Sequence, residues 1–565
     1  MWDQLQWIAV GVPAALLAAL LLRKAWARLL LSRAKHRSLA GHPRWARRLA
    51  RWLPAYEFSL QDMFAADGAP IDVIGLRRAG FDRLSALFGQ RFAATRAATA
   101  GLAGALSDVE FTSRYRVPFQ FSRQVREHLS AGSMLRAAAN RTLTDLDGNE
   151  LYDLTGSYGV NLFGYEFYKG CMARGAQLVS DLGPVLGGLH PVVAYNVRRL
   201  REISQLDAVS FHMSGTEAVM QAVRLARYHT GRRKLVRFCG AYHGWWGEVQ
   251  PGVGNPRTEP ETLTLSDQSD LSLRVLETRR DIACVLVNPL QALHPNVSAP
   301  GDSSLVGGTR KAGADTERYR AWLQRLRDVC TRRGIVLILD EVMMGFRCGA
   351  GGVQSLYGIR ADMVTYGKSL GGGLPVGVVC GRADLMRRYR EDHPADICFA
   401  RGTFNAHPYV MGAMHEFLRH LENPDVQREL GEADSLWNQR AAALNARLEA
   451  ADLPLRMASL GSVWTMCFPS PSRYHWMLQY YLRAEGIALS WVGSGRCIFS
   501  LDYTAAEFDD VCRRIVAAAT LMQQDGWWWA PAGDGRKLIR GRLLREMAQA
   551  WWRAWFGSTS SPLSR

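Results

Sequence analysis

Short apolar runs alternate with helical stretches between about residues 205 and 400 of the 565-residue chain. Apolar strands that alternate with helices are typical of a mostly parallel sheet with helices on its faces. The sequence therefore predicts an α/β fold in this region. The expected strands are Val209–Met213, Leu235–Phe238, Cys284–Val287, Val336–Leu339, Met363–Tyr366 and Val376–Cys380.

Different patterns flank this region. Residues 142–154 alternate polar and apolar side chains around an Asp-Gly pair, which predicts a β-hairpin. After Pro408 a long helical segment leads into a smaller α+β region, and residues 32–135 have a helical and irregular pattern. We expect a transmembrane anchor (1–31), a basic membrane-proximal helical extension (32–135), an N-terminal segment of the catalytic body (136–204), a large ligand-binding domain (205–424), a small C-terminal domain (425–525) and a basic Trp-rich amphipathic tail (526–565).

The amino terminus begins with an apolar run. No charged residue occurs from Trp7 to Leu22, and Arg23 and Lys24 follow at once. With the sparsely charged residues up to Leu31, the run is long enough for a single helix to cross a bilayer. No acidic residue lies among the ten basic residues of Arg23–Arg51. The positive-inside rule therefore predicts a helix that spans the cytoplasmic membrane, with the catalytic body in the cytoplasm. The alternative is a buried or interfacial helix that associates only peripherally.

Two basic segments mix arginine with tryptophan and leucine at helical spacing. They are His42–Leu53 and Arg536–Phe556. Indole rings favour the headgroup zone of a bilayer and arginines favour anionic lipid, so we expect helices that lie on a lipid bilayer. An amphipathic helix docked on the protein body is the alternative. Eleven of the 18 tryptophans fall in residues 1–52 and 527–555, which favours lipid contact through both termini.

The net charge of +17 is concentrated at the two ends. Residues 1–51 contribute +9 and residues 536–565 contribute +6. A nearly neutral body with two basic ends is unlike a nucleic-acid groove, so we expect no nucleic-acid partner. The ten cysteines form no C-x-x-C pair and no His/Cys cluster at metal spacing, so we expect reduced thiols and no metal.

Lys368 is the candidate catalytic residue. Only seven of the 69 basic residues are lysines, and this one precedes the glycine-rich segment Gly371–Gly373. Arginine stays protonated near pH 7, whereas a desolvated lysine amine can lose its proton and attack a carbonyl carbon. The glycines let a planar ligand approach the backbone closely. We therefore expect Lys368 to form a Schiff base.

Further candidate residues follow the predicted strands in a fixed order. Ser214-Gly215-Thr216 is a small-residue turn before a helix, which suits a phosphate group or, in the simpler interpretation, an ordinary N-cap. Tyr242-His243 places an aromatic ring where it can stack on a flat heterocycle. Asp340 ends a strand 28 residues before Lys368, where a carboxylate can pair with a pyridine nitrogen. With Thr403 as a second phosphate ligand, the set indicates pyridoxal 5'-phosphate.

On these motifs the chain resembles the class III aminotransferases, which are fold-type I pyridoxal-phosphate enzymes. The resemblance extends over about residues 136–525, above all to glutamate-1-semialdehyde aminomutase and to aminotransferase domains of natural-product pathways. It rests on Ser214–Ala218, Tyr242–Gly244, Asp340–Arg347 and Gly367–Gly377. It implies a fold-type I transferase with a mostly parallel central sheet flanked by helices and a smaller C-terminal α+β domain.

The resemblance also implies the role of each site residue. Lys368 would carry the cofactor and move a proton on the substrate, and Asp340 would contact the pyridine nitrogen. Val342 and Tyr242 would pack on the two faces of the ring. The phosphate would be held by Gly215 and Thr216, and Thr403 would reach the phosphate of the partner subunit, since the family works as a homodimer.

Several positions depart from the family pattern. They are Met213 for a frequent Asn, Asn288 for Glu, Met344 for Thr, and Asn405–Pro408 for Ser-Gly-Asn-Pro. None removes the lysine, the aspartate or the phosphate turn, so the departures concern the substrate side. We expect a membrane-anchored aminotransferase that moves an amino group from a small-molecule donor to a carbonyl acceptor, lipophilic or carrier-bound. The alternatives are an aminomutase of the glutamate-1-semialdehyde type and a cofactor-binding pseudoenzyme or scaffold.

Overall fold

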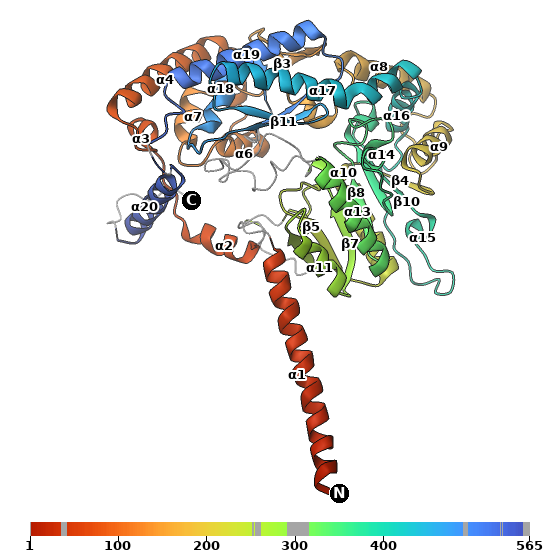
Figure 1. The fold of residues 1–565 in the computed structure, drawn as a ribbon. Coiled ribbons are helices and arrows are strands. Elements are labelled where there is room, and N and C mark those ends of the chain that lie inside the picture. The colour runs from red at the N-terminus through yellow and green to blue at the C-terminus, as the bar shows by residue number, and fades with distance from the viewer. Residues whose placement is uncertain are drawn as a thin grey trace.

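The computed structural model describes residues 2–35, 42–250, 254, 261–290, 316–489, 495–531, 533 and 535–556, with side chains from residue 13 onward. Figure 1 shows a body built of sheets and helices, from which the amino-terminal helix α1 projects. The functional candidates lie in the body.

A seven-stranded sheet forms the centre of the large domain. Strand β10 runs antiparallel to both of its neighbours, and the other pairs are parallel. In spatial order the strands are β4 (Ala208–His212), β10 (Gly377–Gly381), β9 (Met363–Gly367), β8 (Val336–Asp340), β7 (Ile282–Val287), β5 (Lys234–Phe238) and β6 (Thr262–Leu265). All six predicted runs are strands, which confirms the mostly parallel α/β sheet. The edge strand β6 was not predicted.

Helices cover the large sheet, and every residue of β7, β8, β9 and β10 is buried. Helix α10 follows β4 directly and turns its small and branched residues Ala218, Val219, Ala222 and Val223 inward. The helices of this part are α8 (Tyr165–Leu178), α9 (Val192–Ser204), α10 (Gly215–Thr230), α11 (Asp270–Thr278), α13 (Thr316–Arg333), α14 (Gly352–Tyr357), α15 (Ala383–Met386) and α16 (Pro408–His420).

Two smaller sheets connect the beginning and the end of the catalytic body. One has the order β1 (Leu135–Ala139), β2 (Thr142–Asp145), β3 (Glu150–Asp153) and β13 (Ile487–Ala488), and the other β11 (Arg456–Leu460), β12 (Val463–Cys467) and β14 (Arg496–Ile498). The predicted hairpin is the antiparallel pair β2–β3. Strand β13 pairs in parallel with β3. The helices here are α17 (Pro424–Ala450), α18 (Leu478–Ala484) and α19 (Ala505–Gln524).

The extension before β1 shares its core with the C-terminal part. Arg77 is fully buried, forms a 2.6 Å ion pair with Asp67, and donates to the carbonyl oxygen of Gly526. Trp527, counted above among the tryptophans that favour lipid, is fully buried instead, and its indole N–H donates to the Tyr481 hydroxyl. The helices are α2 (Pro43–Trp52), α3 (Leu60–Ala65), α4 (Ile71–Arg91), α5 (Ala93–Ala100), α6 (Ser107–Tyr115) and α7 (Ser122–His128).

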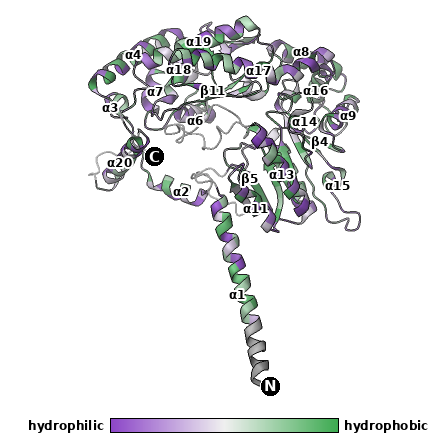
Figure 2. Cartoon of the chain, in the orientation of Figure 1, coloured by the Kyte–Doolittle hydropathy of each residue, from purple (hydrophilic) through white to green (hydrophobic). Residues whose placement is uncertain are grey.

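The two terminal helices differ in how they attach. Among the described side chains of helix α1 (Trp2–Ala34), those of Leu30 and Ala34 in its last turns are buried, and the Ser266 N–H donates to the Ala34 carbonyl. The rest of α1 projects away from the body, and its described part is largely apolar (Figures 1 and 2). Helix α20 (Gly535–Phe556) lies against the body and buries Ile539 and Ala550.

The predicted transmembrane run, Trp7–Leu22, begins among residues whose side chains lie outside the described part. Within the part that is described, no helix has the length and apolar content needed to cross a membrane.

Candidate active site

Asp340 lies at the carboxyl end of β8 and is held from three sides. Its Oδ2 lies 2.7 Å from His243 Nδ1, and its Oδ1 accepts hydrogen bonds from the Val342 N–H at 3.2 Å and the Thr365 hydroxyl at 3.3 Å. Asp340 and His243 are both buried. Because β5, β8 and β9 are mutually parallel, the residues that follow them meet at one edge of the sheet. The carboxylate therefore has one fixed orientation.

Lys368 follows β9 at the same edge and begins the short 3-10 turn η5 (Lys368–Gly371). Its backbone is left-handed, with φ of 49°, which non-glycine residues adopt rarely. Burial lowers the pKa of Lys368 below its ordinary value, and the nearby Arg347 charge lowers it further, while Asp340 acts in the opposite direction. A larger share of the amine is therefore neutral near pH 7, which is the nucleophilic form.

A left-handed turn that the sequence did not predict lies against this lysine. In η2 (Gly156–Gly159), all four residues have positive φ, including Ser157 at 45° and Tyr158 at 57°. A Cβ on Gly159 would lie 3.1 Å from Lys368 Cδ and 2.3 Å from Met343 Sδ, and the φ of +97° at this position strains any residue other than glycine. The two glycines in Gly-Ser-Tyr-Gly directly after the hairpin were the available sequence signal.

Arg347 connects this turn to the C-terminal part. Its guanidinium is buried and donates to the carbonyl oxygens of Gly159, Asn161 and Phe499 and to the Ser462 hydroxyl. Burial among these neutral partners lowers the pKa of Arg347 to about 10. The sequence identifies Arg347 as part of a motif but does not predict these contacts, because its partners are mostly backbone atoms far away along the chain.

The predicted phosphate turn lies at the start of α10. The Ser214 hydroxyl accepts from the Glu217 N–H at 3.3 Å, so Ser214 is the N-cap that the simpler interpretation expected. Gly215 is packed against Val342, since a Cβ there would lie 2.7 Å from Val342 Cγ1. Thr216 is buried and lies beside Gly244. The structure therefore brings the turn, Val342 and the loop of His243 together.

Two predicted residues are more exposed. Tyr242 is 57% exposed, next to the buried His243, and its carbonyl oxygen accepts from the Asn288 side chain at 2.9 Å. Asn288, a departure from the family pattern, therefore holds this loop. Thr403 lies on an exposed turn before α16, and the described residues of the single chain do not bring it to the other site residues.

These residues fit pyridoxal 5'-phosphate. A fixed, buried carboxylate stands near a lysine of lowered pKa, and a helix N-terminus without a Cβ at Gly215 lies beside them. The buried His243 Nε2 has no hydrogen-bond partner among the described residues, which leaves a polar atom for a ligand. When bound, the cofactor supplies an electron sink at the carbon that exchanges its amino group. Asp340, Lys368 and Gly215–Thr216 would hold it.

Comparison with known proteins gives the family of the chain. Residues 124–298 and 303–519 match the family model "Aminotransferase class-III". The glutamate-1-semialdehyde 2,1-aminomutase of Geotalea daltonii is 32% identical over 382 residues, which are 64% of this chain and 83% of that protein.

Two solved structures show the same fold. A transaminase with PLP bound is 26% identical, with a TM-score of 0.57 over 69% of this chain and 92% of that one. A glutamate-1-semialdehyde-aminomutase from Pseudomonas aeruginosa PAO1 is 20% identical, with a TM-score of 0.62 over 79% of this chain and 99% of that one. The family match covers more than half of the chain and includes every site residue described above. This chain belongs to the class-III aminotransferases, enzymes that use pyridoxal 5'-phosphate.

Proposed function

We propose that the protein is a transaminase that moves an amino group from a small-molecule donor to a carbonyl acceptor. The proposal rests on one observation: Lys368, with its lowered pKa, and the fixed Asp340–His243 pair lie at the same edge of the sheet. In this function the Lys368 amine takes a proton from the substrate carbon and returns it, as a general base and acid. The Asp340 carboxylate keeps the ring nitrogen of the cofactor protonated.

The first test is optical. Purified protein with cofactor should absorb at about 400–430 nm, as a lysine-bound cofactor does. The band should be absent from Lys368→Ala, while Lys24→Ala, a lysine on the projecting helix, should keep it. An equal band in Lys368→Ala would contradict the assignment of this lysine.

An aminomutase is the second candidate, because the relative from Geotalea daltonii carries that name. An aminomutase moves the amino group within one molecule and needs no external donor, whereas a transaminase stops without one. Turnover of glutamate-1-semialdehyde without a donor would support the aminomutase, and strict dependence on a donor would support the transaminase.

The proposal also includes a membrane location, supported by the surfaces of three helices. Helix α2 buries none of its residues and exposes Trp45 and Trp52 beside its arginines. Helix α20 exposes Trp551, Trp552 and Trp555 at its end. In the view of Figure 1, α2 lies between the body end of α1 and α20. We propose that α1 anchors the protein to the cytoplasmic membrane and that α2 and α20 lie on lipid.

Vesicle flotation tests this location. Replacing Trp551, Trp552 and Trp555 together with serine should weaken binding to anionic vesicles roughly tenfold or more, because about three indole surfaces are lost. Ile71→Ser, at an 88% exposed position on α4, is the matched control and should bind normally. Extraction with alkaline carbonate separates a spanning α1, which stays in the membrane, from a peripheral one. Equal flotation of the triple variant would contradict lipid contact by α20.

Membrane location favours a lipophilic or carrier-bound acceptor, since a surface-bound enzyme meets such substrates at high local concentration. Activity with long-chain aldehydes or ketones, and its absence with short ones, would support this acceptor class.

We further propose a homodimer in which Thr403 acts across the subunit interface. Its exposed position away from the site in a single chain is compatible with this role. Thr403→Ala should release cofactor more easily without changing the molecular mass in solution. A monomer with full activity would contradict the dimer.

A further inference from the structure

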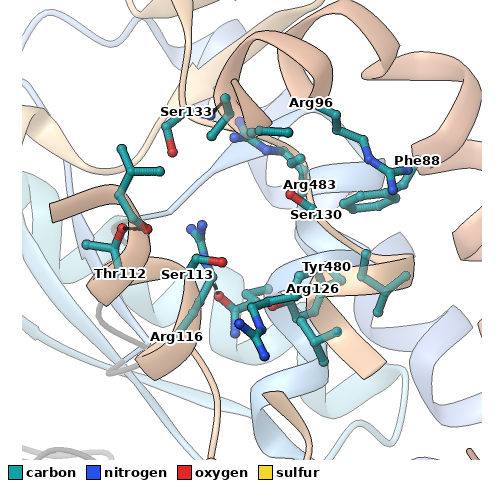
Figure 3. Close-up of a pocket in the computed structure, with 18 of the residues that line it drawn as sticks. Phe88, Arg96, Thr112, Ser113, Arg116, Arg126, Ser130, Ser133, Tyr480 and Arg483 are labelled. Carbon is teal, nitrogen blue, oxygen red and sulfur yellow. Dashed lines mark hydrogen bonds between the residues drawn. The ribbon is translucent and has the colours of Figure 1, made fainter. Parts of the chain in front are cut away.

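A cavity of about 280 Å³ lies between the extension and the C-terminal part of the chain, as Figure 3 shows. Its lining comes from α4, α5, α6 and α7 on one side and from α18 and β13 on the other. Nearly half of the lining residues precede residue 124, where the family match begins. The cavity is therefore built in large part by the extension, and it is separate from the phosphate turn at Ser214–Thr216.

Four arginines line this cavity. They are Arg96 on α5, Arg116 just after α6, Arg126 on α7 and Arg483 on α18. The single acid of the lining is Glu110, which pairs with Arg114 at 2.5 Å. The lining therefore carries a surplus of three positive charges.

None of the four arginines forms an ion pair with a residue in the described part of the chain. Arg116 donates to the Gln479 side chain at 3.0 Å and Arg96 to the Glu127 carbonyl at 3.2 Å. Arg126 and Arg483 have no side-chain hydrogen bond to the residues described, and Arg126 Nε is buried without a partner.

The four arginines are half-buried, whereas two fully buried arginines of this region are paired. Arg77 binds Asp67 and Arg473 binds Glu546, each at 2.6 Å, and both arginine side chains are fully buried. Gathering four arginines around one carboxylate, which is already paired with Arg114, destabilises a fold. Burial, together with the charges of Arg116 and Arg91, lowers the pKa of Arg483 to about 10, although Asp145 acts in the opposite direction. An anion bound in the cavity would offset this cost.

The remaining lining residues indicate the kind of anion. The hydroxyls of Ser113, Ser130 and Ser133 add neutral donors (Figure 3), whereas the Thr112 hydroxyl donates to the Val109 carbonyl at 3.1 Å. The apolar residues are Phe88, Val109, Val125, Leu129, Ile487 and Leu489. Guanidinium forks match the oxygens of a phosphate, and three surplus charges suit a dianion better than a monoanion.

We propose that this cavity binds a phosphate ester carried on a small apolar group. Its volume is near the lower end of ligand sites, about 300 Å³, so the ligand is small. The site is additional to the proposed transaminase reaction and does not depend on it. The phosphate can belong to a soluble ester or to a lipid headgroup, and the test separates these sources.

The test uses the full chain with its cofactor saturated. Binding is measured by calorimetry with inorganic phosphate, hexyl phosphate, hexanoate and vesicles of dioleoyl phosphatidate. Hexyl phosphate should bind at least tenfold more tightly than inorganic phosphate or hexanoate. Displacement of hexyl phosphate by the vesicles would assign the lipid source, and no displacement would assign the soluble ester. Tighter binding of hexanoate, or no binding of either phosphate, would overturn the proposal.

Variants locate the site. Arg126→Gln and Arg483→Gln should each weaken hexyl phosphate binding at least tenfold, because charge-assisted hydrogen bonds are lost. Arg116→Lys should bind with intermediate affinity. Arg224→Gln removes the same charge from an exposed arginine of α10 that donates to the Phe399 carbonyl at 3.0 Å, and this variant should bind normally.

Stability without ligand gives a second readout. Both glutamine variants should have a thermal midpoint equal to or above that of the parent, since each removes a repelling charge. A lower midpoint in both variants would assign the arginines a structural role and overturn the proposal, as would equal ligand affinity in all variants.

Discussion

Asp340 and Glu341 are chain neighbours with different surroundings. The Asp340 carboxylate faces His243 at the sheet edge. The Glu341 side chain points into the body, where its two oxygens accept hydrogen bonds from the N–H groups of Val353 and Gln354. Burial raises the pKa of Glu341 to about 8. One acid is thus available to a cofactor, while the other organises the segment after β8.

Replacing Asp340 with asparagine tests the first role. The variant keeps the size of the side chain but loses the charge that would hold a proton on the ring nitrogen. We expect kcat to fall roughly 10²–10³-fold, as for loss of one fixed electrostatic contact, with an unchanged thermal midpoint. Asp384→Asn, at an exposed ion pair with Arg382, serves as the control. Activity of Asp340→Asn within threefold of the parent would refute the role.

The raised pKa of Glu341 makes the free energy of unfolding depend on pH. The folded chain keeps the Glu341 proton up to about pH 8, whereas the unfolded chain releases it near its ordinary value of 4.5. The folded state binds more protons in this window, so the free energy of unfolding falls as pH rises from about 4.5 to about 8. Glu341→Gln should lose less stability between pH 5 and pH 8 in thermal unfolding. Parallel pH curves for parent and variant would contradict the raised pKa.

At the scale of elements, the sequence predicts the buried strands but not the edge strand β6 or the turn η2. The strands that carry Asp340 and Lys368 are buried throughout, so their apolar runs were visible. The edge strand β6 is short and alternates Thr with Leu, which gives a weak signal. The turn η2 depends on backbone dihedrals, which hydrophobic patterning does not encode. The contacts of Arg347 were also hidden, because carbonyl partners have no residue signature.

Helix α20 gives a prediction at this scale. Its Glu546 pairs with Arg473, which is fully buried and also donates to the Ala66 carbonyl. Glu546→Ala would leave a buried charge unpaired, so we expect a loss of about 3–5 kcal/mol in the free energy of unfolding, measured with denaturant. Glu391→Ala breaks an exposed pair with Arg387 and should cost less than about 1 kcal/mol. Equal losses would show that α20 is not held by this pair.

At the scale of the whole molecule, the extension and the C-terminal part form one core. Phe64, Phe81, Phe88 and Phe92 of the extension belong to the same buried cluster as Tyr474, Tyr480 and Trp527. Pattern and composition predicted helices in the extension, but they did not show what those helices contact. Such contacts join residues about 400 positions apart and leave no local periodicity.

Truncation tests this shared core. Deleting residues 1–28 removes only the projecting part of α1, so the protein should stay folded and unfold in a single transition. Deleting residues 1–123, up to the start of the family match, would expose the partners of those four phenylalanines and should give insoluble protein. A soluble, active chain after the longer deletion would show that the extension is an independent unit.

The attachment of α1 has a mechanical consequence. With 33 residues at about 1.5 Å each, the helix is about 50 Å long. Its last turn is joined to the edge strand β6 through Ala34 and through the bridge between Lys35 and Leu265. Because of this junction, α1 is held rigidly against the sheet and does not pivot as a flexible linker would. Holding the far end would therefore fix the tilt of the central sheet and the direction faced by the sheet edge that carries Asp340 and Lys368.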